Sequence, residues 1–402
     1  MKSSKKDRKS QLGLVDKSEH GKLYPWQVYR KTSLILSQAI AANRDEYARN
    51  EVARTEACAS SLSFKECIQD KTHPKKLTQA NFCRNRLCVG CQMRRSLKCF
   101  STTVKIVHYL QHEHKDLQFI FLTLTVPNAP IDELGKTVQH MFDSWTKLTK
   151  RRGVKKIMQG YLRCMEITYN HQRDDYHPHF HALIAVKKSF FTGKNYIKRD
   201  KWLEMWREST KQPEITQVDV RKVKANTDEE VLKACGEIAK YSTKTWSTSS
   251  KQSKRKFLGK LDELDYGVEG HLWIRKTPEE TADIALQLSQ ILKGRRLLQY
   301  GGLMRDAKKH LNVKDGEDEG ADLIHTTEKE TGCTCPICKS DLVETQYLWS
   351  KAIGDYRAGR SKGISEIEEN SILDRKTLAR RKAKIEGQEF AASLKKSQET
   401  KL

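Results

Sequence analysis

The sequence predicts an α+β protein, on three observations. Beyond about residue 100, runs rich in β-branched and aromatic residues alternate with stretches of helical period. Two of the runs, 161–169 and 178–186, flank the polar segment 170–175 and predict a β-hairpin. A cysteine-rich segment precedes them. With 402 residues the chain can hold more than one domain.

The elements follow in chain order. Residues 1–22 predict a solvated basic tail, and residues 26–49 carry apolar positions at helical spacing. The run 119–126 predicts a mostly buried strand that Pro127 stops. The other expected elements are a helix over 132–150, strands over 161–169 and 178–186, a short helix and a strand within 201–223, and helices over 227–243 and 279–298. We expect four units: the tail over 1–22, a helix with the cysteine-rich segment over 23–100, an α+β domain over 101–300, and a mainly helical C-terminal region over 315–402.

Charge indicates the partner. Lysine and arginine number 75 against 51 acidic residues, so the formal net charge is +24. Such an excess indicates a polyanion such as nucleic acid. The chain has no apolar run of membrane-spanning length, and its charged first residues do not resemble a secretory signal. We therefore expect a cytoplasmic protein with no membrane partner, in which the 11 cysteines stay reduced.

The first cysteine cluster predicts a zinc site. Cys88-x2-Cys91 has the spacing of a zinc knuckle, Cys83 lies five residues before it, and Cys58 is the preferred fourth thiolate. The spacing leaves open whether Cys67 replaces Cys58, and whether Cys99 takes part. A bound Zn²⁺ would supply folding free energy to this loop-rich segment.

A second cluster near the C-terminus is incomplete. Cys333, Cys335 and Cys338 include one pair with knuckle spacing, but a zinc shell needs four ligands. A second zinc would need His325, an acidic residue or a partner chain to complete it.

Three histidines at alternate positions, His177, His179 and His181, predict a metal site on one face of a strand. If the hairpin turns near Gln172, Glu166 falls opposite His179 and joins the same face. The predicted site thus offers three nitrogens and one carboxylate.

The helix expected over 227–243 begins at a capping box that starts with Thr227. On it, Glu237, Tyr241 and Lys244 share one stripe, while Val231, Cys235, Ile238 and Ser242 lie on another. A tyrosine beside a carboxylate and an amine, with a metal site elsewhere, indicates chemistry on a phosphodiester, in which the tyrosine hydroxyl attacks phosphorus. We expect a set of arginines to contact the DNA phosphates: Arg84, Arg86, Arg94, Arg95, Arg151 and Arg152.

Three motifs in this order resemble those of HUH endonucleases: Phe121-Leu122-Thr123-Leu124-Thr125, His179-Phe180-His181, and Glu237-x3-Tyr241-x2-Lys244. More narrowly, residues 55–250 resemble the single-tyrosine replication initiators of small rolling-circle plasmids, through Cys58-x3-Leu62-x-Phe64, Asn81-Phe82-Cys83-x2-Arg86-Leu87-Cys88-x2-Cys91-x2-Arg94-Arg95 and Glu166-Ile167-Thr168-Tyr169-Asn170.

This resemblance implies a central antiparallel β-sheet with flanking helices. It implies that Tyr241 nicks one strand of the plasmid's double-strand origin, at a hairpin, leaving a 5′-phosphotyrosine and a free 3′-hydroxyl primer. It also implies Mg²⁺ or Mn²⁺ on His179 and His181, with the third ligand open between Glu166 and His177. The implied partners are origin DNA, a host helicase and a DNA polymerase, and a homodimer is left open.

Two alternatives remain. A relaxase or a single-strand transposase uses the same chemistry, but relaxases usually carry the tyrosine before the histidines. A zinc-containing DNA-binding regulator without catalysis explains the cysteines and the charge, yet leaves the Glu237, Tyr241 and Lys244 pattern as coincidence.

Overall fold

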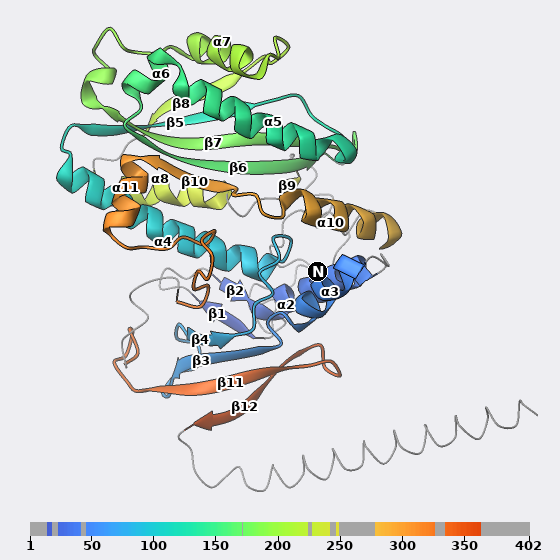
Figure 1. Cartoon of the computed structure of the whole chain (residues 1–402). Helices are drawn as coiled ribbons and strands as arrows, with labels where there is room; N and C mark the ends of the chain where they lie inside the picture. The colour runs from blue at the N-terminus through green and yellow to red at the C-terminus, as the bar shows by residue number, and fades with distance from the viewer. Residues whose placement is uncertain are drawn as a thin grey trace, which may run out of the picture.

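The computed structural model describes residues 14–17, 23–41, 46–170, 172–223, 227–241, 247–248, 278–325 and 334–362. Within them, two main β-sheets are stacked with helices around and between them (Figure 1). The larger sheet and the smaller sheet are separated by a layer that contains the long helix α4 (Val89–Glu113).

The larger sheet has six strands in the order β10-β6-β7-β5-β8, with β9 beside β6. Neighbouring strands are antiparallel, except that β9 runs parallel to β6. The strands are β5 (Leu117–Thr125), β6 (Gly160–Asn170), β7 (Asp175–Lys187), β8 (Val218–Val223), β9 (Ser247–Thr248) and β10 (Leu298–Gly302).

Strand β7 is buried on both faces of this sheet, because successive side chains leave a strand on opposite sides. Phe180 and Ile184 join one hydrophobic core, and Leu183 and Ala185 join a second. The first core includes α5 (Ile131–Lys150), α6 (Arg152–Ile157) and α7 (Arg199–Thr210), and the second includes α4, α8 (Asp228–Tyr241) and α11 (Leu303–His310) (Figure 1). A short 3-10 helix, η1 (Lys188–Phe190), follows β7.

The smaller sheet joins distant parts of the chain. Its strand order is β12-β11-β3-β4, so a C-terminal strand pairs directly with a strand of the cysteine-rich segment. The strands are β3 (Ser61–Cys67), β4 (Lys76–Ala80), β11 (Leu342–Ser350) and β12 (Asp355–Lys362). The remaining elements are β1 (Val15–Lys17), β2 (Leu23–Pro25), α2 (Trp26–Ala41), α3 (Glu46–Ala57) and α10 (Pro278–Leu292).

The α+β fold class is confirmed, and so is the hairpin, which is formed by β6 and β7. The helix expected over 279–298 ends earlier, because Gly294 has a positive φ of 69° and Leu298 already begins β10. The helix expected over 26–49 is assigned instead to two helices, α2 and α3, with 42–45 outside the described residues.

The C-terminal region was expected to be mainly helical, and this is wrong for 334–362. Those residues contain the β-hairpin of β11 and β12. The reason is that Thr345, Tyr347 and Trp349 have high β propensity and that β11 pairs with β3. Residues 363–402 of the region expected to be mainly helical lie outside the described residues.

Candidate functional site

Three side chains that can bind a metal ion lie close together on the larger sheet. Glu166 of β6 lies directly opposite His179 of β7, which is the register that the sequence predicted. Glu166 Oε2 is 3.2 Å from His179 Nε2 and 3.0 Å from His181 Nε2. Their three ligand atoms lie within 4.8 Å of one another. Two imidazole nitrogens and one carboxylate oxygen therefore form a group that can hold one metal ion.

Hydrogen bonds at the opposite ring nitrogens orient both imidazoles. His179 Nδ1 lies 3.0 Å from the carbonyl oxygen of His177, and His181 Nδ1 lies 3.2 Å from Thr123 Oγ1. An imidazole that donates from Nδ1 can offer the lone pair of Nε2 to a metal ion. Metal-binding histidines in proteins are usually oriented in this way.

His177 is turned to a different partner. Its Nδ1 lies 2.7 Å from Asn128 Oδ1, and it is not among the three grouped ligands. Burial, with a smaller contribution from His179, lowers the pKa of His177 to about 4. Of the two candidates for the third ligand, the geometry therefore favours Glu166.

Glu166 carries a buried negative charge. Glu166 is only 3% exposed to solvent. Burial alone would raise its pKa, but hydrogen bonds with His179 and His181 outweigh burial and hold the pKa at about 2. A buried carboxylate anion between two imidazole nitrogens suits a bound cation, since an unpaired buried charge is costly.

Helix α8 begins and packs as the sequence predicted. The Glu230 N–H donates to Thr227 Oγ1 at 3.3 Å, which caps the helix. Val231, Cys235 and Ile238 are buried in the second core. Glu237 and Tyr241 belong to the last turns of α8, although their side chains, like Lys244 as a whole, lie outside what the structure describes.

Helix α8 covers the face of the larger sheet that carries the histidines. Leu183 belongs to the core that α8 shares, and residues two apart on a strand share a face. His181 and His179 therefore face the side of the sheet on which α8 packs.

The direction of α8 carries its C-terminal end toward the histidines. Asp228 Oδ1 lies 3.5 Å from His108 Nε2 near the end of α4, and a Cβ at Gly236 would contact the ring of Phe100, so α8 runs antiparallel to α4. After α8, strand β9 pairs with Thr168 and Tyr169 of β6, so the chain that follows α8 returns to the part of β6 next to Glu166.

The four predicted thiolates also converge. Cys58 follows α3, Cys83 follows β4, and Cys88 and Cys91 stand at the start of α4. The sulfur of Cys58 lies 3.6 Å from that of Cys88 and 3.7 Å from that of Cys91, and the sulfurs of Cys83 and Cys91 are 3.7 Å apart. A tetrahedral zinc shell places its sulfurs about 3.8 Å apart. The four cysteines thus form a group that can bind a metal, and Cys67 and Cys99 are not part of it.

The backbone around this cluster is arranged for thiolates. The N–H groups of Cys83, Arg84 and Asn85 donate to cysteine sulfurs at 3.3 to 3.4 Å. Arg84 adopts a positive φ of 60°, which turns the loop around the sulfurs. Such N–H donors stabilise negative charge on sulfur.

Five of the six predicted DNA contacts have protein partners: Arg84, Arg86, Arg94, Arg95 and Arg151. Arg86 forms two hydrogen bonds with the Glu317 carboxylate, and Arg84 donates to the carbonyl of Ala321. Arg94 and Arg95 are buried and donate to backbone carbonyls. The expectation is therefore wrong for Arg94 and Arg95, because buried guanidinium groups committed to carbonyls cannot reach phosphate.

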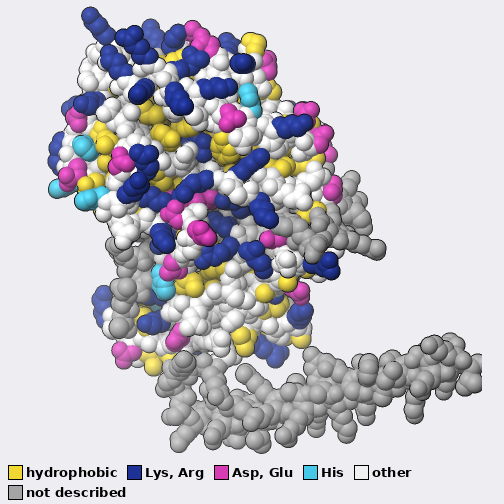
Figure 2. Space-filling view, in the orientation of Figure 1, with side chains coloured by type: hydrophobic (Ala, Val, Ile, Leu, Met, Phe, Trp, Pro, Cys, Tyr) yellow, Lys and Arg dark blue, Asp and Glu magenta, His cyan; other side chains and the backbone are white. Residues whose placement is uncertain are grey.

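The last two of the predicted contacts lie just after α5. Arg151 donates to Ser209 Oγ at 3.0 Å and also to the Glu208 carboxylate, whereas Arg152 is exposed. Lysine and arginine side chains are spread over the visible face of the molecule, with acidic ones among them (Figure 2). No helix among the described residues is long and apolar enough to cross a membrane.

The second cysteine cluster meets partners that the sequence did not indicate. Cys335 and Cys338 group with Cys67 and His73. His325, one of the three alternatives for completing this cluster, pairs instead with Asp322, its Nδ1 2.7 Å from Oδ2. Cys333 lies outside the described residues. His73 was missed because 262 residues separate it from Cys335, and only its place six residues after Cys67 signals a ligand.

An antiparallel sheet with a His-His-Glu group on one face, beside a four-cysteine group, defines an α+β protein built around metal-binding centres. Residues 74–355 match the family model described as replication protein, and the chain belongs to that family. This confirms the resemblance carried by the motifs at the level of a replication protein.

Individual relatives agree. A "Protein rep" of Staphylococcus aureus is 45% identical over 197 residues, which cover 48% of this chain and 82% of the relative. One from Bacillus amyloliquefaciens is 31% identical over 79% of this chain and 90% of its own length. One from Streptococcus pneumoniae serotype 2 is 33% identical over 78% of this chain and 88% of its own length. No solved structure matches the chain.

Proposed function

We propose that this protein initiates rolling-circle replication of a small plasmid in the cytoplasm by nicking one strand of the double-strand origin with Tyr241. The observation that carries the proposal is the His179, His181 and Glu166 group, which lies on the sheet face that α8 covers. Membership of the replication protein family and the net charge of +24 support a DNA substrate.

In the proposed reaction, the Tyr241 hydroxyl loses its proton and its oxygen attacks the scissile phosphorus. The bond from phosphorus to the 3′ oxygen breaks, and that oxygen takes up a proton. The 5′ phosphate stays on the tyrosine as an ester, and the 3′-hydroxyl becomes the primer for a host DNA polymerase, with a host helicase opening the duplex.

His179, His181 and Glu166 would hold Mg²⁺ or Mn²⁺, and the ion, when bound, would polarise the scissile phosphate. The donor set fits such an ion, because an ionised carboxylate oxygen and two imidazole Nε2 atoms point at one another. Thr123 and the His177 carbonyl keep the two rings in place.

The roles of Glu237 and Lys244 follow from their spacing. Glu237 precedes Tyr241 by four residues, one helical turn, so it can activate the water that later releases the strand from the tyrosine. Lys244 would stabilise the negative charge that develops during the attack.

The four-cysteine group would bind a structural Zn²⁺, because four thiolates in a closed shell suit zinc and leave no position for substrate. It would fix the first turn of α4, the helix on which α8 packs. Of the six predicted DNA contacts, Arg84 and Arg152 are exposed.

The proposal is tested with supercoiled plasmid that carries the cognate origin. Tyr241→Phe should abolish nicking and keep origin binding, because only the hydroxyl is removed. Tyr196→Phe, at a tyrosine that is 51% exposed, is the matched control and should nick normally. Nicking by Tyr241→Phe at the normal rate would refute the proposal.

A further inference from the structure

A second group of metal ligands lies at one end of the smaller sheet. Cys67 is the last residue of β3, His73 lies in the loop before β4, and Cys335 and Cys338 lie in a tight turn before β11. The sulfurs of Cys67 and Cys338 are 3.4 Å apart. His73 Nδ1 is 3.4 Å from the sulfur of Cys335 and 3.6 Å from that of Cys338.

These separations are those of a ligand shell. Zn–S bonds of about 2.3 Å and Zn–N bonds of about 2.0 Å place tetrahedral ligands roughly 3.5 to 3.8 Å apart. A disulfide would need its sulfurs about 2.0 Å apart, much closer than those of Cys67 and Cys338. Three sulfurs and one imidazole nitrogen are a common structural zinc set, and four protein ligands leave no open position for a substrate.

Groups around the ligands orient them. His73 Nε2 lies 3.4 Å from Asp70 Oδ2, so the ring has a carboxylate partner on the side opposite the cysteines. Carboxylate partners of this kind are typical of zinc-binding histidines. Asp70 is itself fixed, since its Oδ1 accepts from the Thr72 N–H at 2.7 Å.

The turn that carries the two C-terminal cysteines is closed by its own backbone. The Cys335 N–H donates to the Ser340 carbonyl at 2.8 Å, and the Lys339 N–H donates to the Cys335 carbonyl at 3.0 Å. Lys339 adopts a positive φ of 61°. This turn brings Cys335 and Cys338 to the same side, as in a zinc knuckle.

The site stands where the C-terminal hairpin joins the N-terminal sheet. Leu342, the first residue of β11, pairs with Cys67, and the Ile68 N–H donates to the Asp341 carbonyl. The opposite end of the hairpin contacts the N-terminal helices. Gln27 donates to the carbonyl of Gly354 at 3.1 Å.

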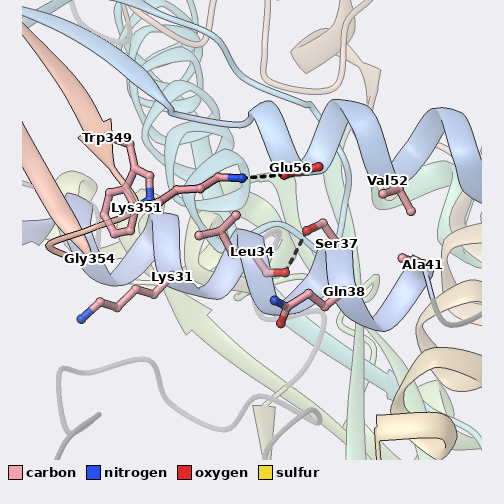
Figure 3. A pocket seen from close by; sticks show the side chains of 10 residues that line it. All are labelled: Lys31, Leu34, Ser37, Gln38, Ala41, Val52, Glu56, Trp349, Lys351 and Gly354. Carbon is pink, nitrogen blue, oxygen red and sulfur yellow. Dashed lines mark hydrogen bonds and ion pairs between the residues drawn. The ribbon is translucent and has the colours of Figure 1, made fainter. Parts of the chain in front are cut away.

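A cavity of about 460 Å³ lies at that opposite end, between α2, α3 and the turn after β11 (Figure 3). Trp349 lines it from the hairpin, and Lys351 reaches Glu56 across it at 3.4 Å. Beside the cavity the hairpin also has its own contacts with the N-terminal part of the chain, since Tyr356 is buried and its hydroxyl donates to the Ala59 carbonyl.

We propose that Cys67, His73, Cys335 and Cys338 bind one structural Zn²⁺ that fastens residues 334–362 to β3. This site is separate from the four-cysteine group, and it does not depend on the nicking chemistry. It replaces the expected set with Cys333, and it explains why the chain returns to its N-terminal sheet after 262 residues.

The test is the zinc content of full-length protein by native mass spectrometry, compared between variants. A double variant, Cys335→Ser with Cys338→Ser, should bind one zinc fewer than the parent, because the shell loses two of its four ligands. The matched control is Cys333→Ser, a cysteine of the same segment outside the proposed shell, which should bind as many as the parent. The proposal fails if the double variant keeps the full zinc content, or if Cys333→Ser loses one equivalent.

His73 gives a second comparison that does not remove a C-terminal residue. His73→Ala should lose the same equivalent, whereas His73→Cys should retain it with four sulfurs, and Co²⁺ substitution should show the change from three to four sulfur ligands in the visible spectrum. In the variants that lose the metal, hydrogen exchange should increase in β11, while α4 stays protected. Full protection of β11 in the double variant would overturn the fastening role.

Discussion

Glu166 and His179 face each other across the β6–β7 ladder, and Oε2 of the first lies 3.2 Å from Nε2 of the second. A shift of one residue in this pairing would move Glu166 to the other face of the sheet. The chemistry of the site therefore depends on the register of one hairpin. His181, two residues along the same strand, completes the group.

Replacing His181 by alanine should weaken metal binding and nicking far more than replacing His177. His181→Ala removes a proposed metal ligand and should lower metal-dependent nicking by about 100-fold or more. His177→Ala removes a side chain that bonds Asn128, and should leave the metal affinity close to that of the parent. Titration of Mn²⁺ with each variant checks this. Equal losses of metal affinity in both would contradict the choice of Glu166 as third ligand.

Thr123 should act on the site through His181. Thr123→Val removes the hydroxyl that lies 3.2 Å from His181 Nδ1, so the ring loses its orientation, and metal affinity should fall about 10-fold. Thr137→Val on α5, which removes a hydroxyl bonded to a helix carbonyl, is the control. Calorimetric titration with Mn²⁺ measures both. An unchanged affinity in Thr123→Val would remove this residue from the account.

The Glu237→Ala variant should nick the origin but fail to release the DNA strand from the tyrosine. Without the proposed carboxylate, water is not activated for release, so the covalent protein–DNA product should accumulate. Glu229→Ala, at an exposed position in the first turn of α8, should behave like the parent. Gel analysis of plasmid products over time distinguishes the two. Normal release by Glu237→Ala would rule out the proposed role.

Acid stability should depend on Asp318. Its carboxylate is half-buried, which would raise its pKa, but hydrogen bonds from Lys308 and Arg296 outweigh burial and lower the pKa. The stabilisation is therefore present above the unfolded pKa of about 3.9, and is lost as the pH falls through the lower folded pKa. Asp318→Asn should be less stable than the parent by about 1 kcal/mol at pH 7, with the difference closing below about pH 4.

Urea unfolding at a series of pH values measures this difference. Glu319→Gln, at an exposed neighbour, serves as the control for removing one negative charge. A difference between Asp318→Asn and the parent that stays constant from pH 7 to pH 3 would contradict the assignment.

Short sequence patterns predicted those parts of the site whose residues lie close together in the chain. The hairpin followed from two strand-like runs and a polar turn, and its register placed Glu166 opposite His179. The Cys88-x2-Cys91 spacing likewise predicted a group that closes around Cys58.

Contacts between distant segments were missed, because no short window of sequence contains them. Arg94 looked like a phosphate contact, but its partner is the carbonyl of Leu323 on a segment that packs over α4. The ligand set around Cys335 looked incomplete, because its fourth ligand, His73, lies 262 residues away in the sequence. The C-terminal hairpin is stabilised by the pairing of β11 with β3. Because β3 is far away in the sequence, the local pattern of this region did not reveal the pairing, and a helix was expected.

The most direct test of the central claim is to identify the residue that becomes linked to DNA. The parent protein is incubated with Mn²⁺ and an origin oligonucleotide, digested with trypsin and nuclease, and mapped by mass spectrometry. The account predicts a 5′-phosphotyrosyl nucleotide on the peptide that contains Tyr241, absent from the Tyr241→Phe variant. An adduct on another residue, or nicking with no covalent adduct at any time point, would contradict it.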